Sequence, residues 1–345
     1  MASGEPGVTV MGAGIFGLSI AWALARRGRR VRVIDPAGIG AGASGGLVGA
    51  LSPHAPEGWT DLKAFQLESL LMAGDWWRGV EAAGGRSPGY ARTGRLQPLG
   101  DDAAVAAARA RAEGAATLWQ GRADWAVVPA TGAAWEPASP TGLLVRDTLA
   151  ARIGPRAALA ALAAAIRARG GTIGHGGAAG GTVVWATGAA GLADLTAALG
   201  RPMGGGVKGQ ALALAHAAAD APQVFAGGLH IVPHADGTVA VGSTTERDWD
   251  DPSATDAAIG ALHARAVAAL PALAGAPVVA RWAGLRPRTP SRAPLLGAWP
   301  GRPGHFVANG GFKTGFGLAP RMAEAMADLI LDGDAAGIPV GFRPA

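Results

Sequence analysis

The sequence predicts an α/β fold in which a Rossmann-like dinucleotide-binding domain carries an inserted α+β domain built on an antiparallel sheet. Three observations lead to this prediction. The 345 residues exceed one average domain and suit two interleaved ones. Residues 7–35 have the pattern of a strand, a glycine turn, a helix and a second strand. Residues 207–281 alternate between apolar and polar side chains, as antiparallel strands do.

The composition is that of a globular protein and excludes several kinds of site. Hydrophobic residues make up 49% and charged residues 16%, which allows a large buried interior. Because the chain has no cysteine, it cannot form disulfides, thiolate metal sites or a flavin link through sulfur. The seven histidines lack ligand spacing, so we predict no metal. Lysine and arginine exceed aspartate and glutamate by 30 to 25, which does not by itself indicate a nucleic-acid partner.

The first apolar stretch, Val8 to Ala25, could also be a membrane anchor or a signal peptide, because four arginines follow it closely. Three glycines interrupt the stretch, however. A signal peptide would begin with basic residues, whereas this segment begins with Glu5 and continues into a second strand. We therefore expect a cytoplasmic protein without a membrane segment.

The same stretch has the pattern of a βαβ dinucleotide-binding unit. We expect a strand at 8–11, a turn at 12–16, a helix at 17–27 and a strand at 31–34. Gly12 permits a tight turn, Gly14 lets the backbone approach a pyrophosphate, and Gly17 lets helix and strand pack closely. The N-terminus of the helix would face the phosphates. Asp35 can accept hydrogen bonds from a ribose hydroxyl. The unit leaves nicotinamide and flavin dinucleotides both open.

The next loop favours flavin. The segment GIGAGASGGLVGALSPH, Gly38 to His54, resembles the FAD-binding loop of the glycine oxidase and D-amino-acid oxidase family of amine-oxidising flavoproteins. The resemblance implies that Ala43 and Ser44 contact the pyrophosphate and that Gly46 to Val48 lie beside the flavin. Small side chains suit a backbone that lies against a flat ring.

A competing motif overlaps this loop. Gly42, Ser44 and Gly46 match GxSxG, the turn that presents the nucleophile of a hydrolase. That turn needs a strand before it and a helix after it, whereas Ser44 lies in a glycine-rich loop. We expect Ser44 to donate a hydrogen bond to a phosphate.

Two later segments resemble parts of the same family. TVVWATG, residues 182–188, is similar to a core strand whose end closes over the cofactor. NGGFKTGFGLAPRMAEAMADLIL, residues 309–331, is a glycine-rich turn followed by an amphipathic helix, with Pro320 expected in its first turn. The resemblance implies FAD, with the flavin pyrimidine edge at residues 311–315, and the absence of cysteine predicts that this FAD is bound non-covalently. The expected cofactor-binding residues are Gly12, Gly14, Ile15, Phe16, Gly17, Asp35, Pro36, Ala43, Ser44, Gly46, Leu47, Val48, Thr187, Gly188, Gly311, Phe312, Lys313, Thr314 and Gly315.

The substrate residues are also expected from resemblance. WAGLRPRTPSRAPLLG, residues 282–297, resembles the segment whose first arginine binds the substrate carboxylate, which maps onto Arg286. A planar guanidinium suits such a carboxylate, although a surface arginine in a turn is the alternative. His230 falls where glycine oxidases carry an aromatic hydroxyl, and Lys313 replaces a family arginine. The remaining candidates for the catalytic site are Thr245 and His54.

The domain boundaries follow from these assignments. We expect residues 1–74, 141–200 and 282–345 in the FAD-binding domain, and residues 75–140 and 201–281 in the substrate domain. Residues 75–140 have the pattern of helical pieces with loops, and the ADG at 235–237 predicts a hairpin turn. The stretch 170–182 is shorter than in relatives, so contacts near the adenine are not carried over.

The resemblance implies an FAD-dependent oxidase of small amines or amino acids. A hydride would pass from the substrate Cα to flavin N5, leaving an imine, and dioxygen would reoxidise the flavin to give hydrogen peroxide. Two alternatives stay open, namely a dehydrogenase that uses a quinone or protein acceptor and a tRNA-modifying flavoenzyme. The dispersed arginines disfavour a nucleic-acid partner. A homo-oligomer is possible in any of these cases.

Overall fold

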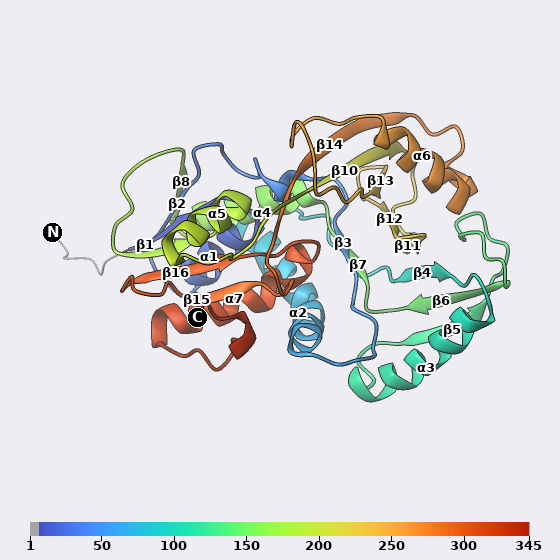
Figure 1. Ribbon diagram of the computed structural model, residues 1–345, viewed down its shortest axis with the longest axis horizontal. Coiled ribbons are helices and arrows are strands. Elements are labelled where there is room, and N and C mark those ends of the chain that lie inside the picture. The colour runs from blue at the N-terminus through green and yellow to red at the C-terminus, as the bar shows by residue number, and fades with distance from the viewer. Residues whose placement is uncertain (1–6, 345) are drawn as a thin grey trace.

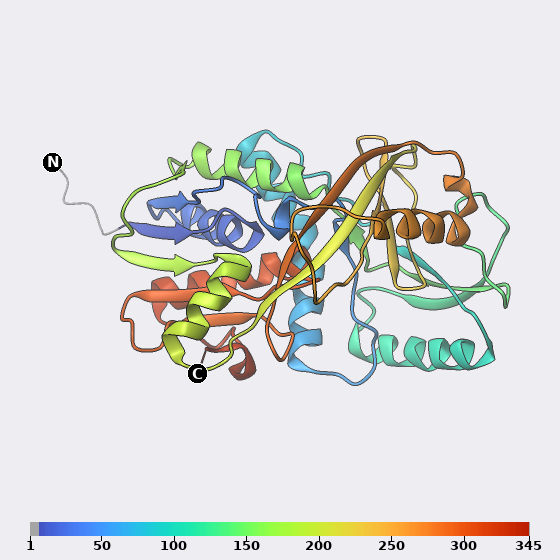
Figure 2. The same ribbon diagram turned by 45° about the horizontal axis from the view of Figure 1, so that its top comes forward.

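The computed structural model describes residues 7–344 and confirms the predicted α/β fold (Figure 1). One lobe contains a six-stranded sheet in the order β15-β16-β9-β1-β2-β8, and the other an eight-stranded sheet in the order β14-β10-β13-β12-β11-β4-β6-β5. A short two-stranded sheet joins β3 (Ala50–Leu51) to β7 (Ala151–Arg152). Figure 2 shows the long strands β10 and β14 running between the two lobes.

The six-stranded sheet contains the predicted βαβ unit. Its strands are parallel except for β15, which pairs with β16 in the antiparallel sense. Valine and isoleucine dominate the central strands, as expected for strands that are buried on both faces. The strands are β1 (Val8–Met11), β2 (Val31–Ile34), β8 (Thr172–Gly174), β9 (Thr182–Trp185), β15 (Leu295–Ala298) and β16 (His305–Asn309).

The long helices of this lobe pack against one another and form one large core with the sheet. Helix α1 begins at Ile15, two residues before the predicted start, because Gly14 has the extended backbone of an N-cap. Helix α7 begins at Gly315, which places Pro320 in its second turn and not in the first. The helices are α1 (Ile15–Arg26), α2 (Asp61–Gly84), α4 (Pro155–Ala168), α5 (Gly188–Leu199) and α7 (Gly315–Asp332), with the 3-10 turn η3 (Val340–Phe342) after them.

The eight-stranded sheet has its own core of leucine, valine and isoleucine side chains. Its longest pairing joins β10 to the edge strand β14 in the antiparallel sense. The predicted hairpin around ADG is present as β12 and β13. The elements are β4 (Arg95–Pro98), α3 (Asp102–Leu118), β5 (Trp125–Pro129), β6 (Leu143–Asp147), β10 (Gly205–Ala215), β11 (Gln223–Ala226), β12 (Leu229–Pro233), β13 (Thr238–Gly242), α6 (Ala258–Ala269), η2 (Pro271–Leu273) and β14 (Val278–Arg288).

Sheet membership differs from the predicted boundaries at three places. Strand β6 pairs with β4 and β5 in the eight-stranded sheet, although residues 141–147 were expected in the other domain. Strand β14 stays in the same sheet up to Arg288, beyond the expected boundary at 282. Helix α2 crosses the boundary at 74 and packs on α4 and α7. Strands β4 and β5 also lie where helical pieces and loops were expected. The division into domains remains a proposal, and residues 1–6 and 345 lie outside the described part.

Across residues 7–344, no helix combines the length and the apolar character that a membrane span requires. Helix α1, inside the stretch that resembled an anchor, has only 12 residues and is covered by α4 and α7.

Candidate active site

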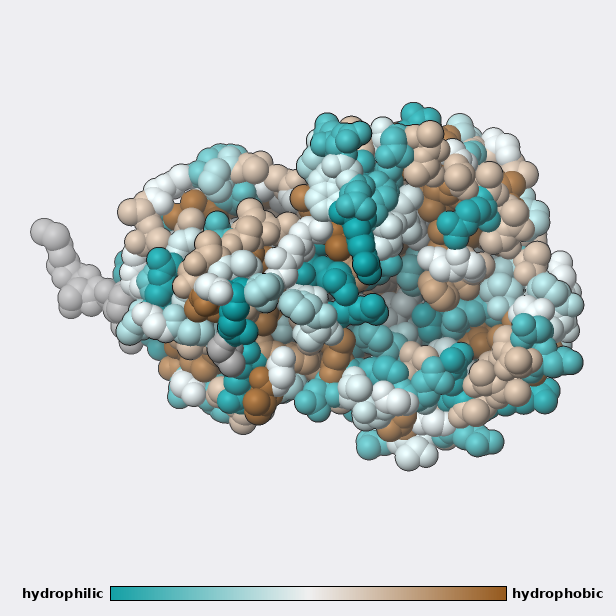
Figure 3. Space-filling view, in the orientation of Figure 1, coloured by the Kyte–Doolittle hydropathy of each residue, from teal (hydrophilic) through white to brown (hydrophobic). Residues whose placement is uncertain are grey.

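A cavity of about 820 Å³ lies where the two sheets meet. Figure 3 shows the surface hollowed between the two lobes. Loops at the carboxyl ends of β1, β2 and β9 line one part, which is where open parallel sheets bind ligands. Strands of the eight-stranded sheet line the other part. The lining includes every expected cofactor-binding residue except Gly17 and Thr314.

Three helices direct their N-termini at this cavity. The N-cap residues are Gly14 for α1, Thr187 for α5 and Thr314 for α7. None of these N-cap residues caps its helix with its own side chain, and no acidic residue lies in the first turns. The remaining N–H groups and the helix dipoles therefore favour negative charge here, as the pyrophosphate of a dinucleotide would bring.

The glycine turn packs tightly against the backbone of the chain itself. Gly12 has φ +107, and a Cβ atom there would lie 2.3 Å from the Ala186 carbonyl oxygen. A Cβ atom on Gly17 would lie 1.9 Å from the Gly12 carbonyl oxygen, so close helix packing requires glycine. Gly17 thus shapes the turn without lining the cavity, as its expected packing role implies.

Ser44 lies in a 3-10 turn, η1 (Ala43–Gly45), and not between a strand and a helix. Its Oγ accepts a hydrogen bond from the Ile15 backbone N–H at 3.0 Å. The surroundings of a hydrolase nucleophile are therefore missing, and the hydroxyl hydrogen remains able to bond a phosphate oxygen.

Asp35 follows β2 at the same edge of the sheet. Its Oδ2 accepts from the Ala13 N–H at 2.8 Å and its Oδ1 from the Ala37 N–H at 3.0 Å. Each carboxylate oxygen keeps a second lone pair, which can accept a ribose hydroxyl. The glycine turn, the three helix ends and this carboxylate together fit a dinucleotide.

Arg286 lies at the other part of the cavity, buried in β14 with 8% exposure. Its Nη1 donates to Ser243 Oγ at 2.6 Å, and its Nη2 donates to the carbonyl oxygens of Lys208 and Thr244 at 3.0 and 2.7 Å. These bonds use three of the five guanidinium hydrogens, so the Nε hydrogen and one on Nη1 remain. Burial lowers the pKa of Arg286 to about 10, which leaves the group charged at neutral pH.

A glycine provides the space for this guanidinium. A Cβ atom on Gly209 of the adjacent strand β10 would lie 2.4 Å from Arg286 Cζ. The side chain of Phe312, whose ring centre is 5.7 Å from the same Cζ, covers another side.

Lys313 and Thr245 come together beside Arg286. Lys313 Nζ donates to Thr245 Oγ1 at 3.0 Å and lies 5.7 Å from the centre of the Phe312 ring. Desolvation and the charges of Arg286 and Arg292 lower the pKa of Lys313. Within the described residues, Asp35 is the one carboxylate that lines the cavity. The part of the cavity around Arg286 and Lys313 therefore favours an anionic group.

His230 lines the cavity from β12, next to Phe225, whose ring centre is 4.7 Å from that of the imidazole. Its Nδ1 is buried and has no hydrogen-bond partner within residues 7–344. Desolvation, followed by the charges of Arg95 and Lys313, lowers the pKa of His230 to about 3. The imidazole is therefore neutral at physiological pH and offers an uncharged polar group to a ligand.

This pKa predicts a pH dependence of stability. The unfolded chain binds a proton at His230 near pH 6.5 and the folded chain only near pH 3, so stability present above pH 6.5 is lost as the pH falls towards 3. In His230→Phe, we expect the loss of unfolding free energy between pH 8 and pH 5 to be smaller by about 2 kcal/mol. Urea unfolding at both pH values measures the difference, and an unchanged loss would contradict the buried neutral state.

His54 does not reach the cavity. Its backbone N–H and its Nδ1 both contact Gln66 Oε1 of α2, at 2.8 and 2.5 Å. The buried Gln66 side chain also donates to the Ser52 carbonyl oxygen. His54 is therefore held by Gln66, which lies 12 residues further along the chain in α2. The sequence of the loop alone does not indicate this contact.

Several residues that the sequence left unmarked support the site. His234 Nε2 lies 3.1 Å from the Leu47 carbonyl oxygen and so contacts the expected flavin loop. Ser243 and Thr244 hold Arg286, as described above. Their position directly after β13 is a signal, since loops at strand ends often carry site residues.

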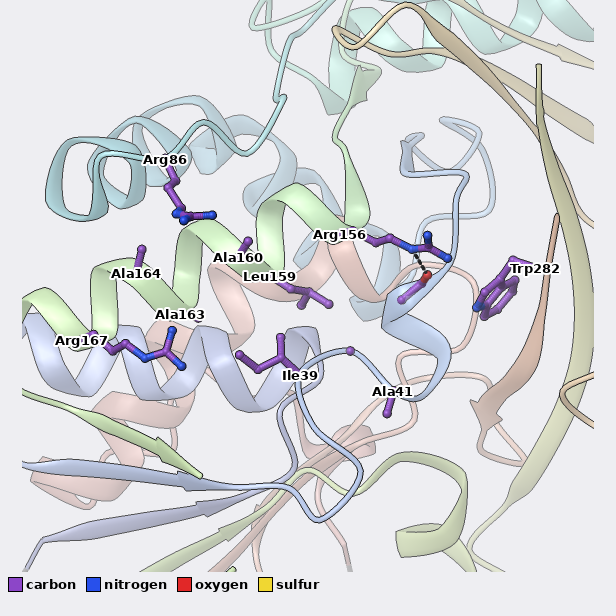
Figure 4. A pocket seen from close by; sticks show the side chains of 12 residues that line it. Ile39, Ala41, Arg86, Arg156, Leu159, Ala160, Ala163, Ala164, Arg167 and Trp282 are labelled. Atoms are coloured by element: carbon purple, nitrogen blue, oxygen red, sulfur yellow. Dashed lines mark hydrogen bonds between the residues drawn. The ribbon is translucent and has the colours of Figure 1, made fainter. Parts of the chain in front are cut away.

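A second cavity of about 790 Å³ lies between α4 and the loop at residues 39–45 (Figure 4). Three arginines line it, and Arg156 donates from Nε to the Gly45 carbonyl oxygen at 2.9 Å. Arg156 thereby supports the loop from the side opposite the first cavity. Trp282 lines both cavities.

The fold and the larger cavity fit one class of protein, the flavin-dependent oxidoreductases. The family described as FAD dependent oxidoreductase matches residues 7–329. The chain belongs to this family, and the resemblance noted in the sequence is confirmed. FAD is accordingly its cofactor.

Relatives by sequence support the assignment. A putative thiamine biosynthesis oxidoreductase ThiO of Rhizobium etli is 33% identical over 345 residues, which cover 94% of this chain and 96% of the relative. Glycine oxidase of Pseudomonas putida is 39% identical over 121 residues, or 35% of this chain. That match spans only 33% of the length of the glycine oxidase.

Solved structures share the fold. Glycine oxidase from Geobacillus kaustophilus has a TM-score of 0.85 at 24% identity, covering 99% of this chain and 98% of that one. Iminodiacetate oxidase from Chelativorans sp. BNC1 has a TM-score of 0.82 at 23% identity, covering 96% of this chain and 97% of that one.

Proposed function

We propose that the protein is an FAD-dependent oxidase of small amines or amino acids. The observation that carries the proposal is Arg286, a buried cation that lines the cavity that fits the dinucleotide and keeps two N–H donors without a partner among residues 7–344. A carboxylate satisfies such donors better than a neutral group does, because charge-assisted bonds are the strong ones. The relatives named glycine oxidase and ThiO agree with an amino-acid substrate.

Each residue then has a role in placing the substrate. Arg286 binds the carboxylate, and Lys313 adds positive charge on the same side. The neutral His230 can accept a hydrogen bond from the substrate amine without repelling it. When bound, FAD would supply the acceptor for a hydride from the carbon that bears the amine, with dioxygen as the final oxidant and hydrogen peroxide as its product. The imine left behind is hydrolysed by water to an oxo acid and ammonia or an amine.

Accurate placement matters more in this reaction than a dedicated base, because a neutral amine can lose hydride directly. We therefore assign no general base. Phe312 and Phe225 flank the cations and the imidazole, which limits the water around the substrate.

An anaerobic screen of small amines and amino acids tests the proposal. We expect some substrates with a carboxylate to bleach the yellow flavin, and admission of dioxygen to restore the colour with about one peroxide per flavin. Bleaching without peroxide on reoxidation would favour a dehydrogenase. If no amine or amino acid in the screen bleaches the flavin, the proposed reaction is wrong.

A further inference from the structure

Two of the three hydrogen bonds that hold the Arg286 guanidinium come from the short segment that follows β13. Ser243 binds the guanidinium through its hydroxyl, whereas Thr244 binds it through its backbone carbonyl. The direction of that carbonyl depends on the hydrogen bonds that hold Thr244 in place. The position of the guanidinium therefore depends in part on Thr244, a residue that does not line the cavity.

The other polar groups of Thr244 are all hydrogen-bonded. Its backbone N–H donates to the Gln210 carbonyl oxygen at 3.2 Å, and its Oγ1 accepts from the Gln210 N–H at 2.7 Å. The hydroxyl donates to the carboxylate of Glu246 in a short hydrogen bond. The Glu246 carboxylate also accepts a hydrogen bond from Gln210 Nε2 at 3.1 Å. It therefore contacts both Thr244 and Gln210, the residue whose backbone bonds Thr244.

Glu246 is itself anchored by a buried cation. Lys208 of β10 has 4% exposure, and its Nζ lies 3.6 Å from Glu246 Oε2. The backbones of Lys208 and Glu246 exchange two hydrogen bonds of 3.0 Å. The carbonyl oxygen of the same Lys208 accepts from Arg286, so the residue that pairs with Glu246 also contacts the guanidinium directly.

Asp256 offers an internal comparison. Its carboxylate lies 3.5 Å from Lys208 Nζ, almost the same distance as that of Glu246, but it is more exposed, and within residues 7–344 no hydrogen bond joins it to Thr244. It accepts from the Ala258 N–H at 2.8 Å, and the Asp256 backbone N–H donates to Gln210 Oε1 at 2.9 Å. The two acids thus share Lys208 and Gln210, and they differ in that the Glu246 carboxylate bonds the Thr244 hydroxyl.

We propose that Glu246 is a positioning residue for substrate binding, acting through the Thr244 hydroxyl to direct the carbonyl that holds the Arg286 guanidinium. The inference rests on the proposed function in one respect, namely that Arg286 binds the carboxylate of the substrate. Glu246 is neither among the residues that line the cavity nor among the expected cofactor residues, so its effect is expected on affinity for the carboxylate and not on the flavin.

The test uses the FAD-loaded enzyme and acetate as the probe, with binding followed by the change in flavin absorbance. In Glu246→Gln, which keeps the shape and removes the charge, we expect acetate affinity to fall about tenfold and KM for a carboxylate substrate to rise similarly, with kcat within about threefold. Asp256→Asn removes the same charge from Lys208 and is expected to stay within about twofold of the parent enzyme on both measures.

A second pair keeps the inference testable if Glu246→Gln does not fold. Thr244→Val removes the hydroxyl and keeps the shape, so we expect the same loss of acetate affinity, whereas Thr244→Ser restores it. FAD content is expected to stay unchanged in all four variants, which a general loss of structure would not allow.

Three results would overturn the inference: equal losses in Glu246→Gln and Asp256→Asn, unchanged acetate affinity in Thr244→Val, or an equal loss of reduction rate with an amine that lacks a carboxylate. Failure of the proposed function looks different. If Arg286→Ala binds acetate like the parent enzyme, the role of Arg286 is wrong, whereas a loss in Arg286→Ala with none in Glu246→Gln removes only the role of Glu246.

Discussion

Arg286→Ala is expected to lower the efficiency of flavin reduction by a carboxylate substrate by about 30-fold to several thousand-fold. The range follows from the loss of one partner of a buried charged pair, which costs about 2 to 5 kcal/mol. Arg286→Lys keeps the charge but cannot reach Ser243, Lys208 and Thr244 while also binding a carboxylate in a fork, so most of the loss is expected there too. Rapid-reaction measurement of anaerobic flavin reduction gives the efficiency.

The control is an amine substrate without a carboxylate. Its reduction rate is expected to change little in Arg286→Ala, and bound FAD is expected to remain, because Arg286 is assigned to the substrate and not to the cofactor. Equal losses for both substrate types would show general damage to the cavity and refute the carboxylate role. A loss for neither would place Arg286 outside the reaction.

Gly209→Ala reaches the same guanidinium from a neighbouring strand. The added Cβ atom would lie 2.4 Å from Arg286 Cζ, so the guanidinium must move. A loss of carboxylate affinity in this variant would support the position of Arg286, since the substitution leaves the charge itself in place.

Gly14→Val is expected to abolish FAD binding in a folded protein. The backbone at Gly14 has φ −82 and ψ −177, which valine tolerates. A Cβ atom there would already lie 3.1 Å from Ser44 Oγ, and the two further methyl groups would occupy the space for the pyrophosphate. We expect affinity for FAD to fall roughly hundredfold or more, because several hydrogen bonds at the helix N-terminus are lost together.

The measurement is the ratio of flavin to protein after purification, followed by titration with FAD. Asp35→Ala provides a graded comparison, with a smaller loss from removing charge-assisted bonds to one hydroxyl. Circular dichroism checks that Gly14→Val is folded. Full flavin occupancy in Gly14→Val at low added FAD would contradict the placement of the pyrophosphate.

Local pattern was sufficient for the first βαβ unit. The strand ends at Met11 and Ile34 match the expectation, because short apolar runs flanked by glycine or an acid depend on neighbours close in sequence. Helix α1 begins two residues earlier than predicted. The sequence does not distinguish a glycine that ends a turn from one that caps a helix, so Gly14 gave no signal for the earlier start. The cofactor was also predicted, because the segment from Gly38 to His54 resembles the FAD-binding loop of a known family.

The sequence by itself therefore determined the α/β class, the dinucleotide unit and FAD. Tertiary structure alone decided that β6 joins the eight-stranded sheet, that His54 turns to Gln66, and that Glu246 is connected to Arg286. These contacts join residues far apart in the chain or depend on how one side chain is directed. Periodicity reports which face of an element is buried, but not which distant partner it meets, and that partner is set by how the two sheets pack.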